Sequence, residues 1–197
     1  MDPLSIEQLL TVAARQHQLV STDQATALGV SPTALRAAVE RGWLRPVRRG
    51  IVGVVGAPRS PWERIVAASL AAGPDAVVSH RAAAAVHRFK GVALPPPELT
   101  VPRLRRVRLG GVRVHRSGDL DLADVQEQAG IRITTPMRTV IDIAGGTDDY
   151  LLGRILDDGA VRRLWTAEAV SVRLGELGRS GRAGTVRLRR LLADRLG

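Results

Sequence analysis

The spacing of apolar residues predicts that the chain begins with a helix that supports a helix-turn-helix. Apolar side chains recur at helical spacing at Ile6, Leu9, Leu10 and Ala13. This pattern predicts an amphipathic helix over about 5–16, opened by a capping box from Ser5 to Gln8. Such a helix would complete a three-helix core with the two helices that follow it.

The next stretch, residues 21–42, carries the turn signals of a helix-turn-helix. Ser21 and Gln24 have capping-box spacing, and Gly29 suits the left-handed residue that ends a helix. Ser31-Pro32 then restarts a helix as cap and first residue, where the missing proline N–H does no harm. The residues expected to face inward are Ala25, Leu28, Val30, Leu35, Ala38 and Val39.

The outward face of the second helix and the stretch after it predict contact with DNA. The helix presents Thr33, Arg36, Ala37, Glu40 and Arg41, short polar groups and arginines typical of a groove-reading helix. After Gly42, residues 43–44 and 51–52 resemble two short strands joined by a basic loop, a β-wing. That loop contains Arg45, Arg48 and Arg49, with Gly50 at the turn. A small helical hairpin with a solvated loop is the alternative interpretation.

Beyond the break at residues 56–59, short strands alternate with helices. Expected strands cover 76–78, 99–101, 112–115 and 131–133. Expected helices cover 60–72, opened by a capping box at Ser60, then 79–88, 135–144, 151–156, a stretch from Thr166, and 184–196. The predicted class is α+β, with a winged helix-turn-helix domain over 1–56 and a mixed α/β domain over 57–197.

The charge pattern favours a polyanionic partner. The formal net charge of +10 comes from 28 arginines and one lysine against 19 acids, and it is uneven: +3 over 1–60, +7 over 61–118, −6 over 119–160 and +6 over 161–197. Four arginines crowd the connection before residue 112, at Arg103, Arg105, Arg106 and Arg108. We expect either a loop that contacts phosphates or a solvated loop there.

Composition also narrows the function classes. Cysteine is absent, so disulfides, thiol catalysis and cysteine zinc ribbons are excluded, and a reducing cytoplasm is the expected location. The longest apolar run is too short to span a bilayer, and no membrane partner is expected. His80 and His87 lie seven residues apart without nearby carboxylates; we interpret them as packing against an alanine-rich face, and no metal or cofactor is expected.

One constellation allows an enzymatic alternative. Gly110-Gly111 precedes Asp119 and Asp121, which resembles the Gly-rich turn and Asp-x-Asp with which nucleotidyltransferases hold Mg²⁺. The spacing is about two residues short, so a solvated acidic turn is the preferred interpretation. The chain has no G-x-S-x-G or phosphate-loop motif, and no catalytic residue is assigned.

Several segments together resemble AbiEi-family antitoxins of bacterial type IV toxin–antitoxin (abortive infection) systems. They read VSTDQATALGVSPTALRAAVERGWLRPVRRG, SHRAAAAVH, ELTVPR, GVRVHRS and GIRITTPMRTVIDIA. The resemblance implies an autorepressor that binds double-stranded DNA at its own operator, with inverted repeats. It also implies a C-terminal domain that counteracts a nucleotidyltransferase-like toxin without requiring a stable complex, and a location at the cytoplasmic nucleoid.

On this interpretation the protein is a DNA-binding antitoxin and not an enzyme. Thr33, Arg36 and Glu40 would face base edges. The residues expected on phosphates are Ser31, Arg41, Arg45, Arg48 and Arg49, with Arg103, Arg105, Arg106 and Arg108 as a further candidate cluster. A nucleotidyltransferase with a helix-turn-helix anchor, and a plain repressor without a toxin partner, remain alternatives.

Overall fold

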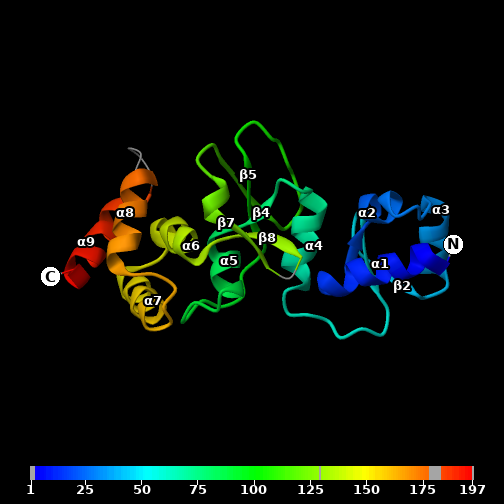
Figure 1. The fold of residues 1–197 in the computed structure, drawn as a ribbon, viewed down its shortest axis with the longest axis horizontal. Coiled ribbons are helices and arrows are strands. Elements are labelled where there is room, and N and C mark those ends of the chain that lie inside the picture. Colours follow the sequence, from blue (N-terminus) through cyan, green and yellow to red (C-terminus); the bar gives the residue numbers. More distant parts are fainter. Residues whose placement is uncertain (1–2, 129, 178–182, 197) are drawn as a thin grey trace.

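The computed structural model describes residues 3–128, 130–177 and 183–196. The chain forms an elongated molecule with a small N-terminal unit at one end, a mixed sheet in the middle and a group of helices at the other end (Figure 1). Within the described residues, no helix is long and apolar enough to cross a membrane.

The N-terminal unit is a winged helix-turn-helix. Its elements are α1 (Pro3–Arg15), β1 (Leu19–Ser21), α2 (Thr22–Ala27), α3 (Pro32–Glu40), β2 (Leu44–Arg48) and β3 (Ile51–Val54). The strands form an antiparallel sheet in the order β1-β3-β2. Its core consists mainly of buried residues from the helices and this sheet, including Leu9, Val30 and Leu35. The predicted fold class is confirmed.

The turn chemistry predicted from the sequence is confirmed in α2 and α3. Ser21 and Gln24 form a reciprocal capping box, and the Ser31 hydroxyl accepts a hydrogen bond from the amide of Ala34 at 3.1 Å. Gly29 has φ +79°, the left-handed conformation that a side chain would strain. Val30 is 2% exposed and closes the turn.

Three local predictions in this unit were wrong. Helix α1 begins at Pro3, so Ser5 lies inside it and is not its cap. The strand β1 was missed because three buried residues are too few to show a period. Arg45 and Arg48 belong to strand β2, and the loop between the strands is only Arg49-Gly50.

The middle of the molecule is a five-stranded mixed sheet in the order β6-β5-β4-β8-β7. The strands are β4 (Val77–Val78), β5 (Glu98–Pro102), β6 (Arg113–Ser117), β7 (Val125–Gln128) and β8 (Ile131–Thr134). The β4–β8 and β5–β6 pairs are parallel, and the others are antiparallel. Helix α4 (Glu63–Ala72) packs its apolar residues on β4, β5 and β8.

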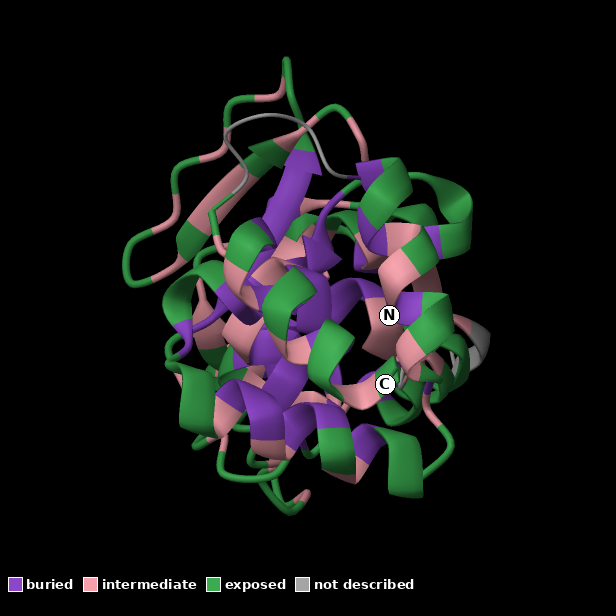
Figure 2. Cartoon of the chain, turned by 90° about the vertical axis from the view of Figure 1, so that its left-hand side faces the viewer, coloured by how far each residue is buried: buried purple, intermediate pink, exposed green. Residues whose placement is uncertain are grey.

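The remaining helices gather on the other side of the sheet and at the C-terminal end. They are α5 (His80–Val86), α6 (Pro136–Ile143), α7 (Asp149–Val161), α8 (Ala167–Leu177) and α9 (Thr185–Leu196), with short 3₁₀ turns η1 (Leu122–Asp124) and η2 (Ala144–Gly146). A second core is formed by residues of all the helices from α5 through α9. The buried positions line the inward sides of these helices (Figure 2).

Several predictions in this part also needed correction. Helix α4 begins at Glu63 with no side-chain cap, because Ser60 instead accepts from the amide of Trp62. Helix α5 ends at Val86 and α7 continues to Val161, past the predicted end at residue 156. Strand β7, with the sequence VQEQ, was missed because three of its four residues are polar and none is fully buried.

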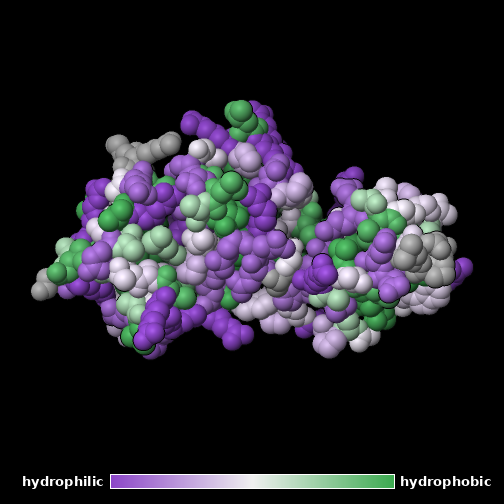
Figure 3. Space-filling view, in the orientation of Figure 1, coloured by the Kyte–Doolittle hydropathy of each residue, from purple (hydrophilic) through white to green (hydrophobic). Residues whose placement is uncertain are grey.

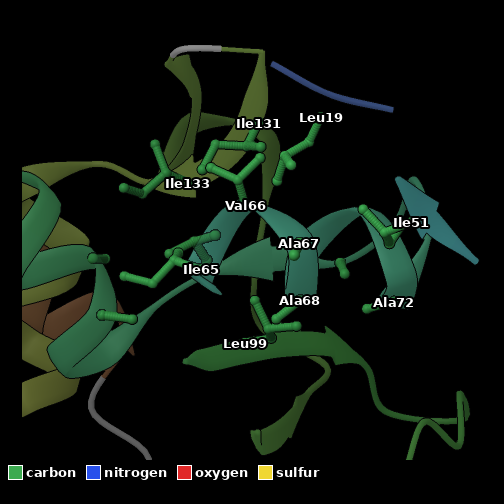
Figure 4. Close-up of a cluster of buried hydrophobic side chains, with 14 of the residues drawn as sticks. Leu19, Ile51, Ile65, Val66, Ala67, Ala68, Ala72, Leu99, Ile131 and Ile133 are labelled. Carbon is green, nitrogen blue, oxygen red and sulfur yellow. The ribbon is translucent and has the colours of Figure 1, made fainter. Parts of the chain in front are cut away.

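Apolar packing is continuous between the winged unit and the sheet. Leu19 of β1 and Ile51 of β3 belong to the same buried cluster as Ile65 and Val66 of α4 (Figure 4). Nearby, Nη1 and Nη2 of Arg45 donate to the two carboxylate oxygens of Glu63 at 3.2 and 2.5 Å. The two predicted domains, 1–56 and 57–197, therefore share one buried core, and the boundary between them stays a prediction.

Replacing Leu19 tests this shared core. Leu19→Ala removes a fully buried side chain where β1 meets α4, so the free energy of unfolding should fall by about 2–5 kcal/mol. Denaturant unfolding of the full chain measures it. Leu104→Ala is the matched control, because Leu104 is 95% exposed and its loss should cost less than about 0.5 kcal/mol. Equal effects of the two substitutions would contradict the packing.

Candidate DNA interface

Helix α3 exposes one polar face away from the core of the winged unit. Thr33, Arg36 and Glu40 are exposed and lie three and four residues apart, so they share one side of the helix. Leu35 and Ala38, on the opposite side, are 6% and 1% exposed. The three residues predicted to read bases thus form a single accessible stripe.

The tip of the wing lies against the arginine-rich loop that joins β5 to β6. Nη2 of Arg48 donates to the backbone oxygen of Gly110 at 2.6 Å, across 62 positions in the chain. Arg48, Arg49 and Arg108 also line one shallow cleft together with Ala71 at the end of α4. Two clusters that the sequence gives separately therefore form one continuous basic surface.

Most side chains of this loop are free to face a ligand. Arg103, Arg106 and Arg108 are exposed, whereas Arg105 turns inward and donates to Asp75 at 3.0 Å and to the Ala72 backbone oxygen at 2.6 Å. Figure 3 shows hydrophilic side chains next to a small hydrophobic group where the molecule projects at the top. Arg105 thus anchors a loop whose other arginines point outward.

Three further residues predicted on phosphates have partners within the chain. Arg45 is held by Glu63, and the guanidinium of Arg41 lies 5.4 Å from the centre of the Trp43 ring. The hydroxyl of Ser31 caps α3, which leaves its own proton for a further acceptor. The structure therefore separates Arg45, which ties the wing to α4, from the exposed arginines of the surface.

The aspartates of the enzymatic alternative are bound to arginines. Asp119 pairs with Arg138 at 3.1 Å, and Asp121 pairs with Arg173 at 3.3 Å. The prediction of a solvated acidic turn was wrong for Asp119, whose side chain is only 15% exposed. A Mg²⁺ site there would have to displace guanidinium groups that already neutralise these carboxylates.

Arg138 is the centre of this ion-pair network and was missed by the sequence reasoning. Its side chain is 3% exposed and contacts Asp119, Asp124 and Asp142, the shortest contact being 2.7 Å to Asp124. Burial alone would lower the pKa of Arg138, but Asp142 and Asp124 outweigh it and raise the pKa, so the guanidinium stays charged. Arg173 also contacts Asp124, at 2.7 Å.

The two histidines at the start and the C-cap of α5, His80 and His87, have different surroundings, and the predicted packing on an alanine face was wrong for His80. His87 is buried and its Nε2 lies 2.7 Å from the backbone oxygen of Thr134; burial lowers its pKa. His80 instead stacks on His115 of β6, with ring centres 3.6 Å apart. Nε2 of His115 lies 3.1 Å from Glu98 of β5, a residue that sequence reasoning did not single out.

Comparisons with known proteins bear on the N-terminal unit. Residues 7–55, from α1 to the end of the wing, match the family described as "Transcriptional regulator, AbiEi antitoxin". Within these residues, the match confirms the resemblance drawn from the sequence. The solved structure of the RV2827C protein from Mycobacterium tuberculosis is similar at 15% identity and a TM-score of 0.44, over 99% of this chain and 83% of that one. At this level the likeness supports no conclusion. No curated protein sequence matches the chain.

Removing the buried guanidinium should be costly. Arg138→Ala leaves three carboxylates close together without their shared cation, so the free energy of unfolding should fall by about 3–5 kcal/mol. Chemical denaturation of the full chain measures it. Arg189→Ala, at an exposed position of α9, is the control and should change stability by less than about 0.5 kcal/mol. A small effect at Arg138 would mean that the network contributes little.

Proposed function

We propose that this protein is a DNA-binding antitoxin that represses its own operon through the winged helix-turn-helix and counteracts a nucleotidyltransferase-like toxin through residues 57–197. The observation that carries the DNA part is the joining of the wing tip to the arginine loop by Arg48 and Gly110. A duplex seated on this surface would meet exposed guanidiniums from two segments of the chain.

The proposed roles follow from exposure. Thr33, Arg36 and Glu40 read base edges in the major groove, because only this stripe of α3 projects free side chains. The phosphates are contacted by the exposed Arg49, Arg103, Arg106 and Arg108, by the partly buried Arg48, and by Ser31 and Arg41 at the two ends of α3. Arg45 and Arg105 hold this surface in place.

The antitoxin part is supported by the family match and by the resemblance of the later segments. The segment ITTPMRTVIDIA contains Thr135, which caps α6, and Arg138, which binds the carboxylates. The motif therefore builds the framework of the C-terminal part. Its Arg138 pairs with Asp119, and Arg173 of α8 pairs with Asp121, which supports a structural role for both aspartates. We propose that neutralisation of the toxin needs this framework and needs neither DNA nor metal chemistry at these aspartates.

Substitutions on α3 and on the wing distinguish recognition of base edges from contact with phosphates. Arg36→Ala should weaken binding to the operator by about 1–3 kcal/mol, roughly 5- to 150-fold, and relax preference at one base position. Fluorescence anisotropy with operator and random duplexes measures both quantities. If the ratio of operator to random affinity stays unchanged, α3 is not the reading helix.

Arg49→Ala and Arg108→Ala are the matched comparisons from the basic surface. Each should weaken all duplexes by a similar factor and reduce the slope of log affinity against log salt by about 0.9, the amount per phosphate contact. Arg163→Ala, an exposed arginine near the other end of the molecule, should leave the slope unchanged. A slope that is the same for Arg108→Ala and the parent chain would remove the loop from the interface.

The antitoxin role is tested with point variants, because truncation at residue 56 would cut through the shared core. When the cognate toxin is induced, Arg36→Ala should rescue growth as well as the parent chain while repression of the operon is lost. Asp121→Asn should keep both activities. The readouts are growth and a promoter fusion at matched soluble levels. Loss of rescue by Asp121→Asn alone would favour metal chemistry there, and failure of the parent chain to rescue would refute the antitoxin role.

A further inference from the structure

The alternation of side chains along β5 and β6 gives this pair of strands one apolar and one polar face. Leu99 and Val101 are 0% and 1% exposed and point into the core beneath α4. Glu98 pairs with Arg113, and Thr100 pairs with His115, so these four side chains lie on the opposite face. That face lines a cavity of about 420 Å³.

Three side chains with metal-binding atoms meet in this cavity. His80 comes from the start of α5, Glu98 from β5 and His115 from β6, and one ligand atom from each lies within 4.8 Å of the others. Zn–N and Zn–O bonds of about 2.0–2.2 Å require ligand atoms about 3.4 Å apart, so shifts of about an ångström would suffice. Nε2 of His115 and Oε2 of Glu98 are already 3.1 Å apart.

We propose that His80, Glu98 and His115 form a binding site for a divalent transition-metal ion of the zinc class. Imidazole nitrogen and carboxylate oxygen in a two-to-one set are ligands that Zn²⁺ accepts at three-residue sites. Magnesium fits the set poorly, because it prefers oxygen ligands throughout. The site uses none of the residues assigned to the surface proposed to bind DNA.

Buried hydroxyl groups orient one of the ligands. Nδ1 of His80 lies 3.0 Å from the hydroxyl of Ser79, which in turn accepts a hydrogen bond from Thr100 at 2.8 Å. Ser79 and Thr100 are 0% and 3% exposed, so this chain of contacts is fixed within the core. Support of this kind behind a histidine sets its ring orientation in metal sites.

The carboxylate is ready to bind a cation. Glu98 is 4% exposed, and its Oε2 faces Nε2 of His115 at 3.1 Å, so its carboxylate is held at the edge of the cluster. Arg113 approaches Glu98 only at 3.4 Å, and its side chain is 69% exposed. This guanidinium competes with a metal for Glu98 and can swing into solvent when the metal binds.

The cavity leaves room for further ligands on the ion. Three protein ligands leave a fourth position of a tetrahedral ion open, as in zinc sites that bind water or a substrate. Arg81 and Arg116 also line the cavity, so an anion is the expected occupant of that fourth position. The remaining wall includes Ile141 and Gly145, from α6 and the turn after it.

Titration calorimetry of the tag-free, full-length chain with ZnCl₂ tests the site. The parent chain should bind one Zn²⁺ in this site and show no binding of Mg²⁺ under the same conditions. His115→Ala and Glu98→Gln should each lower the affinity at least about 10-fold, since each removes one of three ligands. Absence of Zn²⁺ binding by the folded parent chain at millimolar metal would overturn the proposal.

Two further variants distinguish loss of the site from loss of folding and from binding of Zn²⁺ elsewhere on the chain. Arg113→Ala removes the competing charge, so Zn²⁺ affinity should rise about 3- to 10-fold, the effect of a unit charge about 4 Å away that is screened by water, as for this 69% exposed side chain. His17→Asn removes a histidine at the end of α1, at φ 58° where asparagine is tolerated, and should leave the affinity unchanged. An affinity lowered by His17→Asn and unaltered by His115→Ala would refute the site.

Discussion

The packing of β1 and β3 against α4 is the contact on which the arrangement of the molecule depends. Leu19 and Ile51 contribute buried surface to the core beneath the sheet, so the winged unit has a fixed position beside α4. Because the β5–β6 loop is anchored to the end of the same helix by Arg105, the wing tip and the loop meet. An apolar contact thus determines the shape of a polar surface.

The distribution of available charge depends on which charged side chains already have partners within the chain. Most acidic residues after 118 form ion pairs with arginines of the C-terminal part. Arg138 and Arg173 both pair with Asp124, and Arg195 pairs with Asp157. Arginines of the wing and of the β5–β6 loop keep few internal partners. The exposed Arg49, Arg103, Arg106 and Arg108 therefore remain available to a polyanion on that side.

The polar face of β5 and β6 brings metal-binding side chains together at the edge of the sheet. One set of alternating residues is fixed by the core, which leaves the other set free to be charged. In a parallel pair, Thr100 and His115 lie side by side, and the start of α5 brings His80 above them. The cluster thus depends on the strand register and on where α5 begins.

The sequence by itself determined the features that arise from neighbouring residues. The capping box at Ser21, the turn at Gly29, the start of α3 at Ser31-Pro32 and the cap of α6 at Thr135 are local, since each joins groups within four residues. The periodic spacing of apolar residues likewise predicted most of the helices and the fold class. Only the tertiary structure decided which charges are free: Arg45 and Arg49 look alike in sequence, yet one is bound by Glu63 and the other is exposed. The same holds for Glu98, Arg138 and the polar strand β7, because their partners lie many residues away and pairing across such distances depends on the packed fold, which no local pattern encodes.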